Sequence, residues 1–141
     1  MDGITQVKIR SATPEDQPEI QAILEACPEA ANWADTYPML VADSDNTVTA
    51  FLLYRPISGE CEILNLAVHP KRRRLGQAKA LLAHLFDTHP NTIFHLEVRA
   101  SNQAAIGLYQ YLDFKQSGQR PNYYANKETA LLFSRTRRGG D

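Results

Sequence analysis

A β-prone run, a short loop of small residues and an amphipathic helix follow one another in the middle of the chain, and this order constrains the fold more than any other feature. The run is Cys61 to Val68, and from Gly76 to about Thr88 leucines recur at helical spacing. The loop between them contains Arg73, Gly76 and Ala78, and its small residues let the main chain approach a ligand closely. The first amides of a helix lack partners within the helix and lie beside its positive dipole end, so this order indicates a diphosphate site.

The same segment has a plainer interpretation. The basic run at residues 71–74 (KRRR) is, on its own, typical of a solvated loop that leads into an ordinary helix. The order of strand, small-residue loop and helix favours the anion site. The charge balance limits which anion is meant: 15 basic and 16 acidic residues nearly cancel, so we expect no binding of a nucleic-acid backbone.

Hydrophobic periodicity along the rest of the chain predicts an α+β fold, with helices on a central sheet. A helix start at Thr13 is followed by Pro18, which indicates an irregular first turn or a later start. Residues 28–38 are typical of a loop or a short helix. The predicted strands are residues 7–10, 40–42, 48–54, 61–68, 93–98, 114–117 and 130–134, and the later helices cover 76–88 and 102–112.

Length and composition predict one domain over residues 1–141, with a loosely ordered tail at 135–141. The N-terminus lacks the features of a signal peptide, and no apolar run approaches ~20 residues, so we expect a cytoplasmic protein without a membrane partner. Cys27 and Cys61 have no metal-ligand spacing, so neither a bound metal nor a disulfide scaffold is expected. The sequence does not indicate the oligomeric state.

Three blocks of the sequence carry a resemblance to a known family. Residues 62–70 (EILNLAVHP), followed by Arg73-x-x-Gly76-x-Ala78-x-x-Leu81-Leu82, resemble the acetyl-CoA-binding core of the GNAT N-acetyltransferase superfamily. Residues 96–109 and 120–124 are similar to the narrower RimI-type group, whose members acetylate the N-terminal alanine of a small-subunit ribosomal protein. The resemblance covers residues 48–134 well and residues 1–47 poorly.

The resemblance implies the acyl-CoA N-acyltransferase fold, whose central, mostly antiparallel sheet has about six or seven strands. It also implies acetyl-CoA as co-substrate and direct transfer to an amine, with the N-terminal α-amino group of a protein, such as a ribosomal protein, as the acceptor. The residues that it implies in binding acetyl-CoA are Leu66, Ala67, Val68, Arg73, Arg74, Leu75, Gly76, Gln77, Ala78, Asn102 and Tyr109.

Glu97 is unusual even without the resemblance, because it lies within a predicted strand bracketed by helices. Partial desolvation there would raise the pKa of the carboxyl group toward the range of a general base. A salt bridge to Arg99, two residues further on and on the same face, is an equal alternative. The resemblance implies that Glu97 is the general base and makes Glu62 the second candidate.

Tyr109 lies on the apolar stripe of its helix, so a core aromatic is its plainer interpretation. The resemblance implies instead that its hydroxyl protonates the departing thiolate. Asn102 is a suitable N-cap for the same helix, and the resemblance adds a contact with the pantetheine arm.

The acceptor side depends mainly on aromatic residues. Tyr123 and Tyr124 either close the core or line a groove for a peptide N-terminus, and the resemblance favours the groove. Trp33 would form the opposite wall, although the residues around it depart from the family's pattern. Together with Glu62, these are the predicted substrate-binding residues.

Two other functions stay open at this point. One is a GNAT enzyme that acetylates a small amine or a lysine side chain, and the other is a non-catalytic module that senses acyl-CoA. The presence of Glu97, Asn102 and Tyr109 together argues against the sensor, because binding alone requires neither a base nor an acid.

Overall fold

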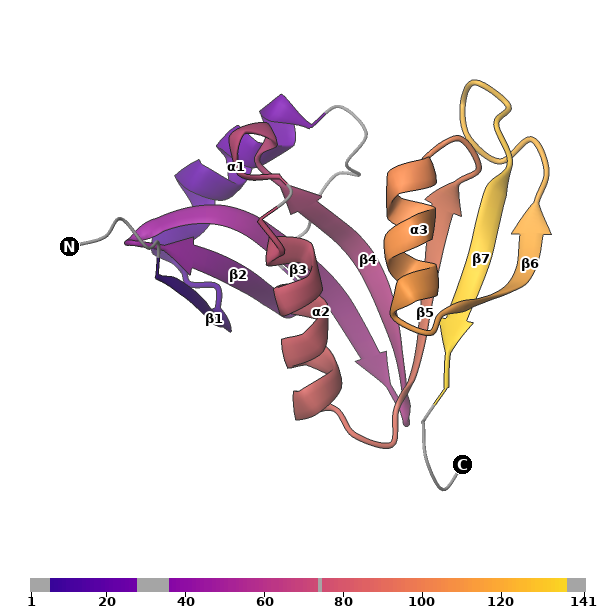
Figure 1. Ribbon diagram of the computed structural model, residues 1–141, viewed down its shortest axis with the longest axis horizontal. Coiled ribbons are helices and arrows are strands. Elements are labelled where there is room, and N and C mark those ends of the chain that lie inside the picture. The colour runs from indigo at the N-terminus through magenta and orange to yellow at the C-terminus, as the bar shows by residue number, and fades with distance from the viewer. Residues whose placement is uncertain (1–5, 28–35, 74, 137–141) are drawn as a thin grey trace. The chain divides into compact units, whose positions relative to one another are not determined.

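The computed structural model describes residues 6–27, 36–73 and 75–136. Within them the chain forms seven strands, three α-helices and two short 3-10 turns (Figure 1). The strands are β1 (Val7–Ser11), β2 (Met39–Ser44), β3 (Thr47–Ile57), β4 (Glu60–Val68), β5 (Ile93–Arg99), β6 (Lys115–Arg120) and β7 (Ala130–Arg135). The helices are α1 (Gln17–Ala26), α2 (Gln77–Thr88) and α3 (Gln103–Tyr111), and the 3-10 turns are η1 (Pro14–Asp16) and η2 (Pro70–Arg72). All of the strands and helices predicted from periodicity are present, with ends that differ by a few residues.

The strands form one mixed sheet in the order β1-β2-β3-β4-β5-β7-β6. The pairs β1/β2, β2/β3, β5/β7 and β6/β7 are antiparallel, whereas β4 and β5 are parallel. The pairing of β4 with β5 joins Glu60–Glu62 to Ile93–His95. The predicted mostly antiparallel sheet flanked by helices is therefore confirmed.

The chain consists of two compact units. The first contains residues 1–55 and 64–89, and the second contains residues 56–63 and 90–141. Strand β4 therefore contributes its beginning to the second unit and its end to the first. The expectation of one domain over residues 1–141 stays a prediction.

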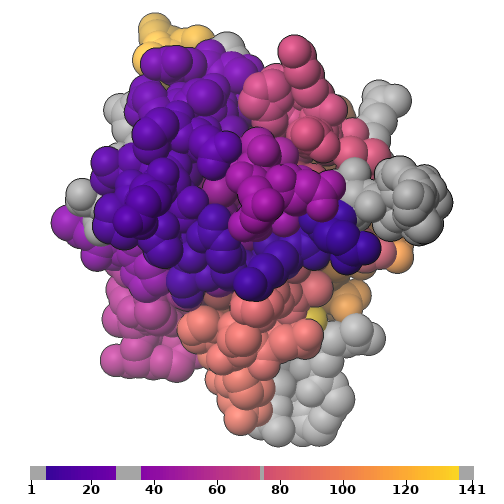
Figure 2. All heavy atoms as spheres, turned by 90° about the vertical axis from the view of Figure 1, so that its left-hand side faces the viewer, coloured from indigo at the N-terminus to yellow at the C-terminus, as the bar shows by residue number. Residues whose placement is uncertain are grey.

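The core of the first unit includes a cluster between α1 and the sheet and the buried side of α2. Strands β2 and β3 are buried along most of their length, and α2 adds three fully buried leucines. Residues of β1 and α1, in indigo and violet, form part of the surface in Figure 2. Each fully buried aliphatic or aromatic side chain contributes about 1.5–3 kcal/mol to stability. The cluster around α1 consists of Ile20, Ile23, Cys27, Met39, Val41, Val48, Phe51, Leu53 and Ala67.

Local chemistry sets how the hairpin and the first helix begin. The β2–β3 turn consists of Asp45 and Asn46, both with positive φ (51° and 73°), as a two-residue type I′ turn requires. Helix α1 begins at Gln17, after the 3-10 turn η1, so the irregular first turn expected from Pro18 is confirmed. Residues 28–35 of the predicted loop lie outside the described residues.

In the second unit, β7 lies between β5 and β6, and α3 follows β5. Asn102 Oδ1 accepts a hydrogen bond from the Ala105 N–H at 3.2 Å, which confirms the predicted N-cap. The prediction of a loose tail from residue 135 is wrong for Arg135. This residue pairs with β5 as the last residue of β7, and its Nε donates to the Leu112 carbonyl at 3.0 Å. Residues 137–141 lie outside the described residues.

Candidate functional site

The predicted diphosphate segment has the backbone that such a site needs. Gly76 has φ +78° and ψ 15°, a left-handed conformation that favours glycine, and α2 begins at the next residue. A Cβ built on Gly76 would meet no atom within 4 Å, so the backbone conformation, not crowding, requires the glycine. The first intrahelical bond runs from the Ala80 N–H to the Gly76 carbonyl at 2.9 Å. Leu75 is exposed and Ala78 half-buried, and Arg74 lies outside the described residues.

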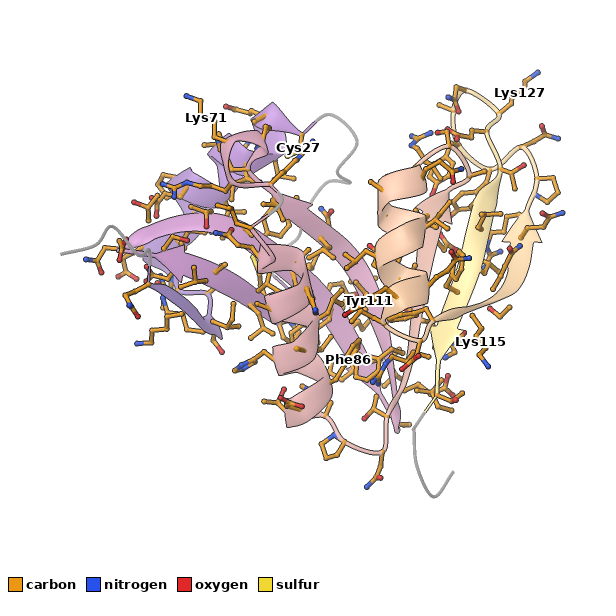
Figure 3. The ribbon with its side chains drawn as sticks, in the orientation of Figure 1. Cys27, Lys71, Phe86, Tyr111, Lys115 and Lys127 are labelled. Carbon is orange, nitrogen blue, oxygen red and sulfur yellow. The ribbon has the colours of Figure 1, made fainter. Side chains whose placement is uncertain are left out.

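The Arg73 side chain contacts residues at the end of β4 and at the end of α1. Its Nε donates to the Val68 carbonyl at 3.3 Å, and its Nη2 lies 3.4 Å from Cys27 Sγ. The Cys27 thiol in turn donates to the same carbonyl at 3.5 Å. Cys27 lies at the end of α1, and Lys71 lies in η2 (Figure 3). These contacts bring together the ends of α1 and β4 and the start of the diphosphate segment.

The predicted cofactor-binding residues of β4 differ in burial. Ala67 belongs to the core of the first unit, whereas Leu66 and Val68 are half-buried on the alternate positions. The Gln77 side chain is also buried, at 3% exposure, and it bonds to side chains of β2 and β3. A ligand could therefore meet Ala67 and Gln77 only through their backbones.

Glu97 is paired with an arginine, but not with the one expected. Arg120 Nε donates to Glu97 Oε2 at 3.0 Å. Arg99 bonds instead to Glu128 at 3.4 Å and covers the ring of Tyr124 at 3.9 Å. The alternative of a salt bridge between Glu97 and Arg99 is therefore wrong, because β6 and the loop after it supply closer partners for both side chains.

The Glu97 side chain is also more exposed to solvent than the sequence indicated. Strand β5 alternates buried Phe94, Leu96 and Val98 with more exposed His95, Glu97 and Arg99. The Glu97 side chain is 36% exposed, so the expectation of partial desolvation overstated its burial. Its position in a strand bracketed by helices does not enclose it, since the buried face of β5 is the apolar one.

Tyr109 is a core residue with a strongly held proton. It is 8% exposed, and its ring meets Phe114 edge-on at 5.6 Å between centroids. Burial raises the pKa of its hydroxyl from 10.0 to about 12. The plainer interpretation of a core aromatic is confirmed, and the hydroxyl remains protonated at neutral pH.

The two tyrosines of the loop after β6 contact each other and two arginines. Their rings meet edge-on at 5.2 Å, and the Arg120 guanidinium lies 5.7 Å from the ring of Tyr123. Burial raises the pKa of Tyr124, and the negative charge of Glu97 adds to the rise. Tyr123 is 49% exposed, so core closure does not account for it. Trp33 lies outside the described residues.

Contacts that the sequence did not indicate connect the same strands. Glu60 Oε1 lies 2.6 Å from His95 Nε2, and His95 Nδ1 lies 2.7 Å from Ser134 Oγ. Glu128 Oε2 accepts from the Ser101 N–H at 2.7 Å. No periodicity or motif could reveal these pairs, because each depends on the register between paired strands or on a loop conformation. Glu62, the second candidate base, is half-buried on β4 and pairs in register with His95.

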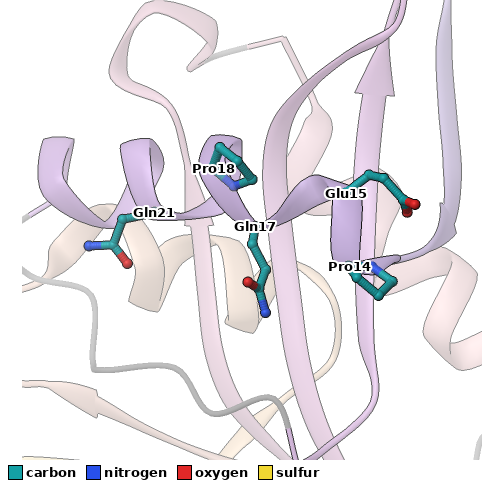
Figure 4. Close-up of a pocket in the computed structure, with 5 residues that line it drawn as sticks. All are labelled: Pro14, Glu15, Gln17, Pro18 and Gln21. Carbon is teal, nitrogen blue, oxygen red and sulfur yellow. The ribbon is translucent and has the colours of Figure 1, made fainter.

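Three further observations concern the rest of the described residues. An open depression at the start of α1 is lined by Pro14, Glu15, Gln17, Pro18 and Gln21, none of which is a predicted site residue (Figure 4). Among the described residues, no group of three or more histidine, cysteine or acidic side chains could hold a metal ion. In the same residues, no helix is long and apolar enough to cross a membrane.

Comparisons with known proteins match most of the chain. Residues 5–114 match the family described as Acetyltransferase (GNAT) family. The chain is 38% identical over 96 residues to a [Ribosomal protein bS18]-alanine N-acetyltransferase of Salmonella typhimurium, a match that covers 66% of this chain and 65% of the relative. It is 37% identical over 111 residues to the protein of that name in Escherichia coli K12, covering 74% and 75% of the two chains.

A solved structure shows the same similarity in three dimensions. The crystal structure of the ribosomal-protein-S18-alanine N-acetyltransferase from Escherichia coli superposes with a TM-score of 0.83 at 28% identity. The match covers 96% of this chain and 97% of that one.

Proposed function

The chain belongs to the GNAT family of acetyl-CoA-dependent N-acetyltransferases, and we propose that its acceptor is the N-terminal α-amino group of a protein that begins with alanine. One observation carries the acceptor side of this proposal. Arg120 contacts both Glu97, at 3.0 Å, and the ring of Tyr123, at 5.7 Å, so the candidate base adjoins the loop that the sequence resemblance assigns to the acceptor. By analogy with the relatives, which are named ribosomal protein bS18-alanine N-acetyltransferases, a ribosomal protein is the first acceptor to test.

The backbone around Gly76 fits the diphosphate of acetyl-CoA. Its left-handed conformation begins α2, and the space beside its Cα is open, so a ligand could approach the first amides of the helix. We assign the diphosphate to the segment Arg73, Arg74, Leu75, Gly76, Gln77 and Ala78. We assign the pantetheine arm to the backbone of Leu66, Ala67 and Val68 and to Asn102. Acetyl-CoA supplies the acetyl group as a thioester.

Glu97 is proposed to take the proton from the acceptor amine, directly or through one water. An N-terminal amine has a pKa of ~7.7–8.0, against ~10.4 for lysine, so a carboxylate of modest basicity is enough for an α-amine. Because Glu97 is exposed and paired with Arg120, an arriving ammonium group would compete with Arg120 for the same carboxylate. Glu62 is the second candidate for this role.

Tyr109 is proposed to donate from its hydroxyl to the departing sulfur. The pKa of about 12 makes it a firm hydrogen-bond donor and a weak acid. A free thiol has a pKa of ~8.5, so complete transfer of the proton would be uphill by roughly 3.5 units, or about 5 kcal/mol. The hydrogen bond would therefore stabilise the negative charge that develops on the sulfur as the thiolate leaves. The proton that the amine gives up would balance the charge of this thiolate.

The acceptor peptide is proposed to lie against Tyr123 and Tyr124, and Trp33 stays a predicted contact of the same peptide. Tyr123 has the exposed ring that packing against a peptide requires. The Arg99 guanidinium already covers the ring of Tyr124 at 3.9 Å. The Tyr124 hydroxyl is therefore the group available to the acceptor. We infer that the reaction takes place in the cytoplasm, where newly made ribosomal proteins present their N-termini.

The experiment that tests the function is thiol release from acetyl-CoA with a panel of acceptors. The panel contains a peptide that begins with alanine, the same peptide with a blocked N-terminus and one internal lysine, and simple polyamines. We expect release only with the first. Release with the lysine peptide or a polyamine would identify the other type of GNAT enzyme, and binding of acetyl-CoA without release would identify a sensor.

A further inference from the structure

Three buried polar side chains form hydrogen bonds with one another at the first residue of α2. Gln77, the first residue of α2, is 3% exposed, and Ser44 of β2 and Thr49 of β3 are 2% and 3% exposed. The Thr49 hydroxyl donates to Gln77 Oε1 at 2.7 Å. Gln77 Nε2 donates to Ser44 Oγ at 3.1 Å, and Ser44 Oγ lies 2.9 Å from Thr49 Oγ1. The three side chains form a closed ring of hydrogen bonds.

The orientation of the Gln77 amide sets the direction of the hydrogen bonds in this ring. A hydroxyl carries a single hydrogen, and the Gln77 Oε1 at 2.7 Å is a closer acceptor for the Thr49 hydrogen than the Ala42 carbonyl at 3.4 Å. Ser44 then donates to Thr49 Oγ1. Each side chain then donates once and accepts once within the ring. Removing any member would leave buried polar groups unpaired, which makes the ring a stiff connection between α2 and the β2–β3 hairpin.

Thr49 also holds the other end of the segment that leads to α2. Its backbone carbonyl accepts a hydrogen bond from the His69 N–H at 2.8 Å, directly after β4 ends. One residue of β3 is therefore bonded to both His69 and Gln77, and Gly76 lies between these two anchors. Packing alone does not require polar residues here, because apolar side chains of similar size would fill the space without the risk of unpaired groups.

We propose that Thr49 is a positioning residue for the diphosphate of acetyl-CoA. By holding both ends of the segment 69–77, it fixes the direction of the first amides of α2. The inference rests on the proposed function, since the ligand of those amides is acetyl-CoA. Thr49 acts through the segment and not by touching the ligand. Its loss therefore weakens binding of the diphosphate and leaves the chemical step unchanged.

The test is Thr49→Val, which keeps the shape of the side chain and removes the hydroxyl. We expect the Kd of CoA, measured by calorimetry, and the KM of acetyl-CoA to rise about tenfold, which corresponds to one lost buried hydrogen bond. The value of kcat at saturating acetyl-CoA should change by less than about twofold. The KM of S-acetylpantetheine, which has the same thioester without the diphosphate, should not change.

Three further variants make this result specific. Thr47→Val removes a hydroxyl from an exposed position of the same strand and should leave every constant unchanged. Thr49→Ser retains the hydroxyl and should bind CoA as the wild type does. If Thr49→Val does not fold, Ser44→Ala breaks the ring of hydrogen bonds at another point and should raise the Kd of CoA.

A lower melting temperature of Thr49→Val with unchanged constants for CoA and acetyl-CoA would show that the ring is structural only and would overturn the inference. An equal loss of affinity for S-acetylpantetheine would also overturn it. A wild-type chain that does not bind CoA would instead overturn the proposed function, so the two failures are distinguishable.

Discussion

Replacing Tyr109 with phenylalanine separates the packing of this side chain from the chemistry of its hydroxyl. The ring keeps its edge contact with Phe114, so the free energy of unfolding should change by less than ~1 kcal/mol. Burial raises the pKa of the hydroxyl from 10.0 to about 12. A rise of about two units corresponds to about 2.7 kcal/mol against the ionised form. The hydroxyl is therefore a hydrogen-bond donor throughout the range in which the enzyme can be assayed.

If this hydroxyl stabilises the departing sulfur, Tyr109→Phe should lower kcat about 100-fold, with little change in the KM of acetyl-CoA. The assay is thiol release with a saturating alanine-initiated peptide, from about pH 6 to about pH 10. Wild-type kcat should show no fall near pH 10, because the tyrosine ionises about two units higher.

Two results would refute this reasoning. An unchanged kcat in Tyr109→Phe at every pH would return Tyr109 to a packing role alone. A wild-type loss of activity near pH 10 that disappears in the variant would show that the hydroxyl ionises as it does in water, which contradicts the effect of its burial.

Two other substitutions test the base and the electrostatics of the fold. Glu97→Gln should lower kcat strongly while the Kd of CoA stays unchanged, because the substitution removes the base and not a cofactor contact. If activity survives in Glu97→Gln and is lost in Glu62→Gln, the base is Glu62. Asp16→Asn should lower the free energy of unfolding at neutral pH by about 2 kcal/mol, because hydrogen bonds from Arg10 chiefly lower the pKa of Asp16 from 3.8 to about 2. This stabilisation is complete above pH ~5 and is lost as the pH falls toward 2, so urea titrations should show the two proteins converging there. A constant difference between them from neutral pH to pH ~2 would contradict the assignment.

The sequence predicted features that depend on neighbours along the chain. The strand, loop and helix around Gly76 were visible because periodicity and small residues act locally, and the structure gives Gly76 the left-handed backbone that begins α2. The N-cap by Asn102 and the irregular turn that precedes α1 were predictable for the same reason, since each needs only the next few residues.

The partners of charged and polar side chains were not predictable in this way. Glu97 and Arg99 are neighbours on one face of a strand, yet Glu97 bonds to Arg120, which is 23 residues away in the sequence. Thr49 bonds to Gln77 across 28 residues. These distances close only when strand register and loop conformation are set, and local patterns carry no information about either.

The sequence alone thus determined which elements form, which segment is the candidate for binding a diphosphate and which side chains are candidates for chemistry. Only the tertiary structure decided which of those side chains are buried, which meet, and what holds the diphosphate segment in place. The physical reason is that backbone propensity and capping act over a few residues, whereas burial, ion pairing and buried hydrogen bonds depend on segments that are distant along the chain.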